Sequence, residues 1–219
     1  MHRLAVERVT ELRPGVSILG HVAELRFSPA EPIIMGMPDL LTPSYWTAEM
    51  VRALPDDGKR YEVVHGELLV TPAPRAWHQV VLGRLFLALS RYLEEQSVGH
   101  LFFSPADISW DRDTLVQPDL FVADLAEART LDWASIRSLL FVAEVLSPST
   151  ARQDRFAKRR RYQEAGVGTY WIVDPDHHAV EIWTPSDLFP QVERDRLIWH
   201  PSGARKAFTL SLQELFLPL

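Results

Sequence analysis

The sequence predicts an α/β fold in which a mixed β-sheet is flanked by helices. Residues 78–94 carry apolar side chains at the spacing of an amphipathic helix. Residues 139–146 form an almost continuous apolar run, which is typical of a central strand. Residues 151–164 form a second helical segment, placed between that run and a further apolar stretch at residues 169–173. Helix, strands, helix and strand in this order predict helices packed against one sheet.

The elements before the central strand follow from local signals. A short helix is expected over residues 47–54, because Pro55-Asp56-Asp57-Gly58 ends it. Residues 61–70 are expected to form a β-hairpin with His65-Gly66 at its turn. Three further short segments have the composition of strands, namely residues 101–103, 106–110 and 120–123.

The elements after the central strand are predicted in the same way. Thr150 is suited to begin the helix over residues 151–164, and Gly166 is suited to end it. The remaining expected elements are strands at residues 169–173 and 180–183, an edge strand at 196–199 and a short helix at 211–216.

Length and composition favour one globular domain. The chain has 219 residues, of which 47% are hydrophobic and 24% are charged. Residues 1–36 show no sustained periodicity, so they are expected to be an N-terminal extension to a domain over residues 37–219. No apolar run approaches the ~20 residues that cross a membrane, and the N-terminus lacks the features of a signal peptide. A cytoplasmic location is therefore expected.

Cysteine content and net charge narrow the chemistry. The chain has no cysteine, which excludes disulfides and thiolate metal sites, so any metal must bind Asp, Glu, His or backbone oxygen. The net charge of −6 argues against a protein that coats nucleic acid non-specifically. It does not exclude a nuclease, because the basic residues are clustered in one segment.

Two carboxylates stand in apolar surroundings. Asp119 leads into one apolar run, and Glu144 lies inside another. Charged side chains are rarely placed in buried strands unless something pairs with them. Two such carboxylates are the hard oxygen ligands that Mg²⁺ or Mn²⁺ requires. The alternative is structural: Asp119 as a turn residue, and Glu144 in an ion pair with an arginine.

These two residues belong to a longer pattern. Its pieces are Tyr61–Leu68, His78, Pro118-Asp119, residues 142–150, Asp154, Lys158, Tyr162, Gly166 and residues 170–175. In this order the pieces resemble the PD-(D/E)XK nuclease superfamily and, within it, the Uma-type restriction endonuclease family. The resemblance covers about residues 61–183. It implies a restriction endonuclease-like fold and a Mg²⁺-dependent (or Mn²⁺-dependent) endonuclease that acts on nucleic acid, with DNA favoured.

The resemblance also implies roles for individual residues. Asp119 and Glu144 would hold the metal, together with the Val145 carbonyl, and Glu62 would be a third acidic residue at the metal. The superfamily usually places a lysine two residues after the glutamate, but this chain has Leu146 there. The Uma-type group supplies the lysine from the following helix, which makes Lys158 the catalytic candidate.

The surroundings of Lys158 on its helix support this assignment. Asp154, Lys158 and Tyr162 are spaced four apart and therefore share a helix face. Asp154 would orient Lys158, and Tyr162 would close the helix side of the site. His78 begins the long helix and could bond a site carboxylate or a phosphate. The alternatives are a solvated Asp–Lys pair and an ordinary, partly buried histidine.

Six basic residues lie between positions 152 and 161. Among them, Arg155, Arg159 and Arg161 are candidates for contacts with the nucleic-acid backbone. A solvated run of charges is the alternative.

Two other functions stay open. One is a nuclease-like fold that binds nucleic acid or protein with weak or no catalysis, which the displaced lysine and the acidic composition favour. The other is a protein-interaction homodimer. Metal binding discriminates the first of these from an active nuclease. No membrane partner is expected.

Overall fold

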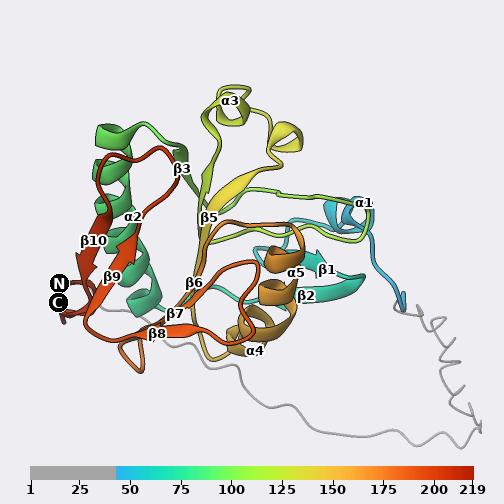
Figure 1. Cartoon of the computed structure of the whole chain (residues 1–219). Coiled ribbons are helices and arrows are strands. Elements are labelled where there is room, and N and C mark those ends of the chain that lie inside the picture. Colours follow the sequence, from blue (N-terminus) through green and yellow to red (C-terminus); the bar gives the residue numbers. More distant parts are fainter. Residues whose placement is uncertain (1–42) are drawn as a thin grey trace, which may run out of the picture. The chain divides into compact units, whose positions relative to one another are not determined.

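The computed structural model describes residues 43–219, and the expected domain boundary between residues 36 and 37 lies outside them. A mixed six-stranded sheet in the order β3-β4-β5-β6-β7-β8 organises this part of the chain (Figure 1). Its strands are β3 (His100–Phe103), β4 (Leu120–Ala123), β5 (Leu139–Val145), β6 (Tyr170–Asp174), β7 (Ala179–Trp183) and β8 (Gln191–Glu193). Only β5 and β6 are parallel. The α/β fold with a mixed sheet is confirmed.

The long helix α2 (Ala76–Gln96) covers one face of the sheet. Its apolar stripe packs against alternate residues of the central strands, including Ala143 and Val145 of β5. The hairpin of β9 (Arg196–Trp199) and β10 (Phe208–Ser211) lies beside α2 in Figure 1. This hairpin and the short helix α6 (Leu212–Leu215) complete the layer.

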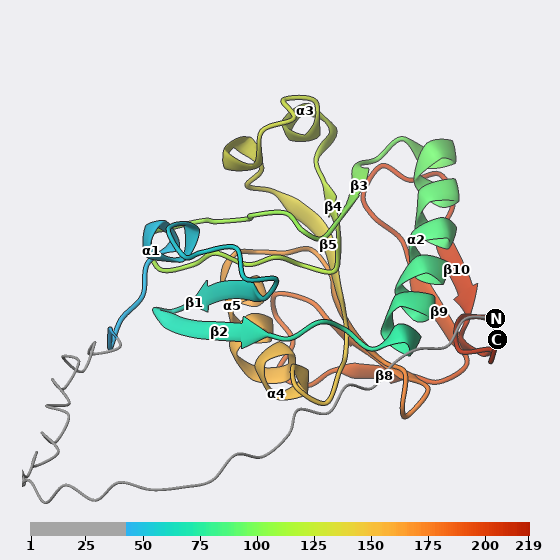
Figure 2. The same ribbon diagram turned by 180° about the vertical axis from the view of Figure 1, so that it is seen from behind.

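The opposite face carries the first hairpin and the helix that follows β5 (Figure 2). Strands β1 (Arg60–Val64) and β2 (Glu67–Thr71) pair antiparallel around His65-Gly66. Both turn residues have positive φ, 51° and 77°, and a glycine favours this conformation. The hairpin is therefore confirmed. The short helix α1 (Ala48–Arg52) precedes it, with Thr47 accepting a hydrogen bond from the Met50 N–H.

The expected helix over residues 151–164 is present but contains a wide turn. It consists of α4 (Ala151–Gln153), a π-helical turn (Asp154–Lys158) and α5 (Arg159–Glu164). The Arg159 N–H bonds the Asp154 carbonyl five residues earlier, which defines the wide turn. Thr150 precedes this helix but makes no capping hydrogen bond with its side chain, because its hydroxyl accepts from the Ser147 N–H. Gly166 ends it with a φ of 72°.

Two strand predictions are wrong. Residues 106–110 form only a single bridge, between Ile108 and Val116, because the Ser109 hydroxyl bonds the carbonyls of Asp111 and Thr114 and turns the chain. Residues 196–199 are a strand but not an edge of the main sheet. They pair with β10 instead, so that Leu197 and Trp199 pack under α2.

The remaining helices are short. They are α3 (Leu125–Ala128) and a 3₁₀ turn at Trp133–Ser135. No helix within residues 43–219 has the length and apolar character that crossing a membrane requires.

Candidate active site

Two carboxylates, those of Asp119 and Glu144, lie at one end of the neighbouring strands β4 and β5. The antiparallel register pairs Leu120 with Ala143, which places the residue before β4 opposite Glu144. The Asp119 N–H donates to Glu144 Oε2 at 3.3 Å, and the Val145 N–H donates to Asp119 Oδ2 at 2.9 Å. Both side chains are buried. The fold thus brings together the two carboxylates that the apolar runs singled out.

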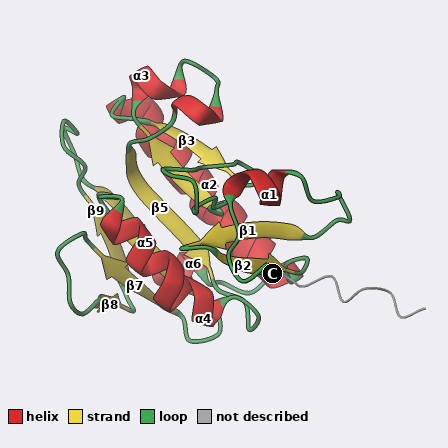
Figure 3. Cartoon of the chain, turned by 90° about the vertical axis from the view of Figure 1, so that its right-hand side faces the viewer, coloured by secondary structure: helices red, strands yellow, loops and turns green. Residues whose placement is uncertain are grey.

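Lys158 lies among three carboxylates. Its Nζ is 2.9 Å from Glu62 Oε2, 3.1 Å from Glu144 Oε1 and 3.5 Å from Asp154 Oδ1. The Tyr162 hydroxyl also donates to Glu144 Oε1, at 2.9 Å. Lys158 is only 1% exposed, and Asp154 and Tyr162 are equally buried, so the alternative of a solvated surface pair does not hold. Figure 3 shows the helix α4–α5 lying over the sheet, which is how it reaches these strands.

Glu62 and His78 join the same cluster from other elements. Glu62 comes from β1, and its Oε1 accepts a 2.7 Å hydrogen bond from the Gln117 N–H, just before the Asp119 position. His78, in the first turn of α2, has its Nε2 3.0 Å from Asp119 Oδ2. The contact of His78 with a site carboxylate, expected from the sequence, is therefore present.

Arg60 is a member of the site that the sequence analysis missed. Its Nη1 donates to Asp119 Oδ1 at 3.0 Å, and more weakly to Ser104 Oγ and to the Gln117 carbonyl, at 3.4 and 3.5 Å. The sequence feature that could have identified Arg60 is its position two residues before Glu62, because alternate residues of a strand point to the same side. An arginine and a glutamate at that spacing face the same cluster.

The cluster carries excess negative charge when its four acids are ionised and His78 is neutral. Its cations are Arg60 and Lys158. Its carboxylates are those of Glu62, Asp119, Glu144 and Asp154. Four carboxylates against two cations leave two negative charges uncompensated. Buried charge of this kind is costly unless a proton or another cation neutralises it.

The pKa values of the two central carboxyls move apart. Burial raises the pKa of Glu144 to about 8, with Lys158 opposing the change and Asp119 adding to it. Burial also acts to raise the pKa of Asp119, but the hydrogen bond from His78 and the charge of Arg60 outweigh it and hold that pKa below its usual range. Without a further cation, Glu144 therefore keeps a proton at neutral pH, and Asp119 stays ionised.

A cavity of about 400 Å³ opens beside the cluster. Arg60, His78, Asp119 and Asp154 are among the residues that line it, whereas Lys158 and Glu144 are not. Asp119, Asp154 and Arg60 are thus the carboxylates and the cation through which the cluster meets a ligand. Lys158 does not line the cavity and is buried behind the carboxylates that do.

The residues fit a divalent metal ion in kind and in charge. All the candidate donors are hard oxygens, and one of them, Glu62 Oε2, already lies 2.9 Å from Lys158 Nζ. Two uncompensated negative charges match a divalent cation. No three Asp, Glu or His side chains in the described part of the chain are grouped to hold a metal. Coordination by Asp119 and Glu144 with the Val145 carbonyl and water suits Mg²⁺, which typically takes one or two carboxylates.

Comparison with known proteins identifies the family. Residues 48–213 match Uma2, a family described as "Putative restriction endonuclease". The chain belongs to the Uma2 family. A solved structure described as a "putative nuclease belonging to DUF820" from Anabaena variabilis ATCC 29413 is similar, with a TM-score of 0.67. At 21% sequence identity, the alignment covers 78% of this chain and 97% of that one, which shows a common, restriction endonuclease-like fold. No curated protein matches the chain.

In this Uma2 chain, two of the arginines predicted to contact nucleic acid are held by the fold. Arg155 pairs with Asp174 at 2.8 Å and with Glu181 at 2.7 Å. Arg161 is buried, and its Nη2 lies 2.6 Å from Asp111 Oδ2. These contacts bind the helix to its surroundings.

The other arginines of this helix differ in exposure. Arg159 lies over the Trp183 ring, 4.6 Å from its centroid, in a cation–π contact. Arg160 is exposed and pairs with Glu164 in the same helix. Arg152 is exposed and makes no ion pair within residues 43–219. The basic segment therefore presents fewer free cations than its composition indicates.

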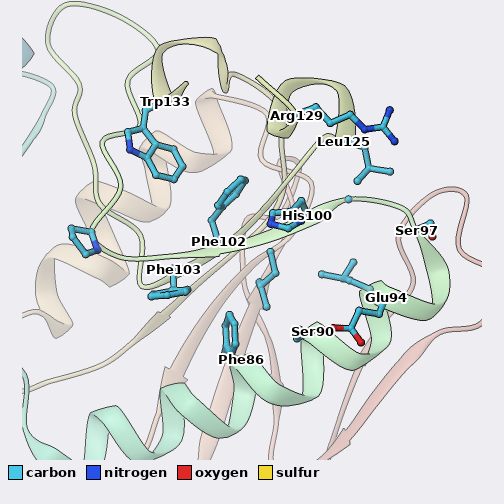
Figure 4. Close-up of a pocket in the computed structure, with 14 residues that line it drawn as sticks. Phe86, Ser90, Glu94, Ser97, His100, Phe102, Phe103, Leu125, Arg129 and Trp133 are labelled. Atoms are coloured by element: carbon cyan, nitrogen blue, oxygen red, sulfur yellow. Dashed lines mark hydrogen bonds between the residues drawn. The ribbon is translucent and has the colours of Figure 1, made fainter. Parts of the chain in front are cut away.

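A larger cavity of about 730 Å³ lies along β3, between α2 and α3 (Figure 4). Aromatic rings dominate its lining, including Phe86, Phe102, Phe103 and Trp133. Its lining has no cluster of carboxylates, so the chemistry of this Uma2 protein is better placed in the smaller cavity. Phe103 lines both.

Proposed function

We propose that this Uma2 protein is a metal-dependent endonuclease that hydrolyses phosphodiester bonds in DNA. One observation carries the proposal: Asp119 and Glu144 are locked together at the ends of two central strands, in a buried cluster whose excess charge matches a divalent cation. Membership of a family described as "Putative restriction endonuclease" supports it.

The metal would be held by Asp119 and Glu144, with the Val145 carbonyl. A bound Mg²⁺ or Mn²⁺ would supply positive charge to the phosphate and lower the pKa of water. His78 and the Val145 N–H fix the orientation of Asp119, because both contact Oδ2. Tyr162 and Lys158 fix Glu144 in the same way through Oε1.

Lys158 is the permanent cation of the site. Burial acts to lower its pKa, but Glu144, Glu62 and Asp154 outweigh this and raise it. Lys158 therefore stays protonated and contributes through its charge and through its hold on Glu144. Direct contact with water or phosphate, as the family resemblance implies, requires the ammonium group to move toward the cavity.

The test is a nuclease assay with supercoiled plasmid, linear duplex DNA, single-stranded DNA and RNA, each with Mg²⁺, with Mn²⁺ and with EDTA. An endonuclease converts the closed plasmid to open or linear forms, which an exonuclease cannot do. Asp119→Asn should abolish cleavage while keeping the side-chain shape. Asp176→Asn, at an exposed carboxylate outside the cluster, is the matched control. Failure of wild-type protein to cut any substrate would remove the proposal.

A second candidate is a nuclease-fold binding module with weak or no catalysis. The burial of Lys158 away from the cavity favours it. Such a module would bind nucleic acid equally well with EDTA and with Mg²⁺, and Asp119→Asn would not weaken that binding.

A further inference from the structure

Arg60 occupies the place on Asp119 that a metal ion would need. Asp119 Oδ2 already faces His78 and accepts from the Val145 N–H, at 3.0 and 2.9 Å. The other oxygen, Oδ1, accepts from Arg60 Nη1 at 3.0 Å. A divalent ion and the Arg60 guanidinium therefore compete for the same carboxylate oxygen.

The two cations of the cluster are not equally free to move. Lys158 is 1% exposed, contacts three carboxylates and does not line the cavity. The Arg60 side chain is 21% exposed and lines the cavity. Apart from Asp119, its hydrogen-bond partners are two oxygens at 3.4 and 3.5 Å, and its Nε makes no hydrogen bond but lies 3.9 Å from Glu62 Oε2. Arg60 is thus the cation that can leave its carboxylate and reach a ligand.

We propose that Arg60 exchanges partners during the reaction. When a divalent ion takes Asp119, the guanidinium releases Oδ1 and binds the phosphodiester that enters the cavity. The inference rests on the proposed function and adds to it a substrate-binding residue. A guanidinium presents a planar fork of N–H donors that matches two phosphate oxygens, which an ammonium cannot do.

Charge balance favours the exchange. With its acids ionised and His78 neutral, the cluster, Arg60 included, carries two uncompensated negative charges, which one divalent ion neutralises. At Asp119 the ion then replaces the guanidinium as the countercharge, while Arg60 stays at the cavity. A phosphodiester brings one negative charge into the cavity, and Arg60 is the lining cation close enough to the metal candidate to pair with it.

The test separates metal binding from nucleic-acid binding in Arg60→Gln and Arg60→Lys. Lys59→Gln is the control, because it removes the same charge from the neighbouring, exposed position. Calorimetry with MnCl₂ alone measures the affinity of each variant for Mn²⁺. Arg60→Gln should bind Mn²⁺ roughly tenfold more tightly than wild type, equivalent to about 1.4 kcal/mol, because the competing cation is gone.

Nucleic-acid binding should change in the opposite direction. A short duplex DNA titrated in Ca²⁺ should bind Arg60→Gln more weakly, with the salt slope lower by about 1 because one phosphate contact is lost. Arg60→Lys should keep near-normal Mn²⁺ affinity but regain only part of the DNA affinity, because the fork is missing. Lys59→Gln should match wild type in both measurements.

Other outcomes overturn the inference. If Arg60→Gln binds Mn²⁺ no more tightly and DNA no more weakly, while wild type cleaves and Asp119→Asn does not, Arg60 is a structural ion-pair partner and the proposed function stands. If wild type binds no Mn²⁺, the exchange and the proposed function fall together. If Arg60→Gln does not fold, Arg60→Lys decides: unchanged DNA affinity in that variant contradicts the exchange.

Discussion

The Lys158 ammonium lies 2.9 Å from Glu62 Oε2 and so joins the helix after β5 to the first hairpin of the fold. These residues are far apart in the sequence, and their two elements lie on the same face of the sheet. Because Lys158 also contacts Glu144 on the central strand, one side chain links three elements. Structure and electrostatics at this site are therefore inseparable, and substitutions there need a measurement of stability beside any measurement of activity.

Removing the Lys158 charge should destabilise the protein strongly. Lys158→Met keeps much of the side-chain length but leaves buried carboxylates without their shared cation, which should cost about 3–5 kcal/mol of unfolding free energy. Arg160→Ala removes an exposed partner of Glu164 and should cost at most about 1 kcal/mol. Urea unfolding at pH 7 measures both. Equal losses in the two variants would contradict the structural role of Lys158.

The metal-free protein should lose stability as pH rises from about 5 to about 8. The pKa of Glu144 is raised to about 8 in the fold from an ordinary value of 4.5, so its contribution is fully present below the ordinary value. That contribution disappears as the folded carboxyl ionises. Urea midpoints across this pH range in EDTA measure the effect. The difference in urea midpoint between wild type and Glu144→Gln should change with pH in this way. A difference that stays constant across the pH range would refute the prediction.

Ionisation of Asp119 should have the opposite effect on stability, which should fall as the pH becomes acidic. Its pKa is held below the usual range, so its contribution to stability is present above the ordinary aspartate value and is lost as pH falls below it. Asp119→Asn should therefore weaken the acid-induced loss of stability. Acid titration followed by circular dichroism tests this, and an unchanged acid midpoint in the variant would argue against it.

Divalent metal should stabilise the fold, more at pH 8 than at pH 6. Binding to the native state raises stability by mass action, by about 2.7 kcal/mol at a hundred times the dissociation constant. The shift should grow with pH because Glu144 must release its proton to act as a ligand. Thermal unfolding with millimolar Mg²⁺ and Mn²⁺ measures it, with Asp119→Asn as the variant that loses the shift. A melting temperature that neither metal changes at either pH value counts against a metal site.

Arg161 should matter for stability rather than for nucleic-acid contact. Arg161→Ala removes the ion pair with the exposed Asp111 and the buried hydrogen bond to Thr114 Oγ1, and should cost about 1.5–3 kcal/mol. Arg152→Ala, at an exposed position of the same helix, should leave stability within about 0.5 kcal/mol. The salt dependence of DNA binding should be unchanged in Arg161→Ala. A slope lower by about 1 would instead support the phosphate contact predicted from the sequence.

The sequence was sufficient where local pattern and burial agree. Glu144 stands out because it interrupts an apolar run, and the spacing of Asp154, Lys158 and Tyr162 predicts one buried helix face. The hairpin follows from His65-Gly66. These features depend on neighbours in the chain, so pattern reasoning reaches them.

Long-range contacts account for what the sequence analysis missed. Arg60 joins the site because the hairpin packs against the strand ends, bringing it to Asp119 from 59 positions away. The periodicity of apolar residues within a segment carries no information about such a long-range contact. Strands β8 and β10 are short and were not expected for a similar reason, since their pairing partners rather than their own composition define them.

The π-helical turn has a consequence for the phase of the helix. In an ideal α-helix, residues four apart drift by about 40°, so Asp154 and Tyr162 would diverge by about 80°. The wide turn holds one more residue per winding and reduces that drift, which keeps both side chains inward. Deleting Ala157 would remove the extra residue and restore regular α-helical winding, so the residues after it would keep their phase. Tyr162 would still face the Glu144 carboxylate, whereas Asp154 and Lys158 would be three residues apart in place of four.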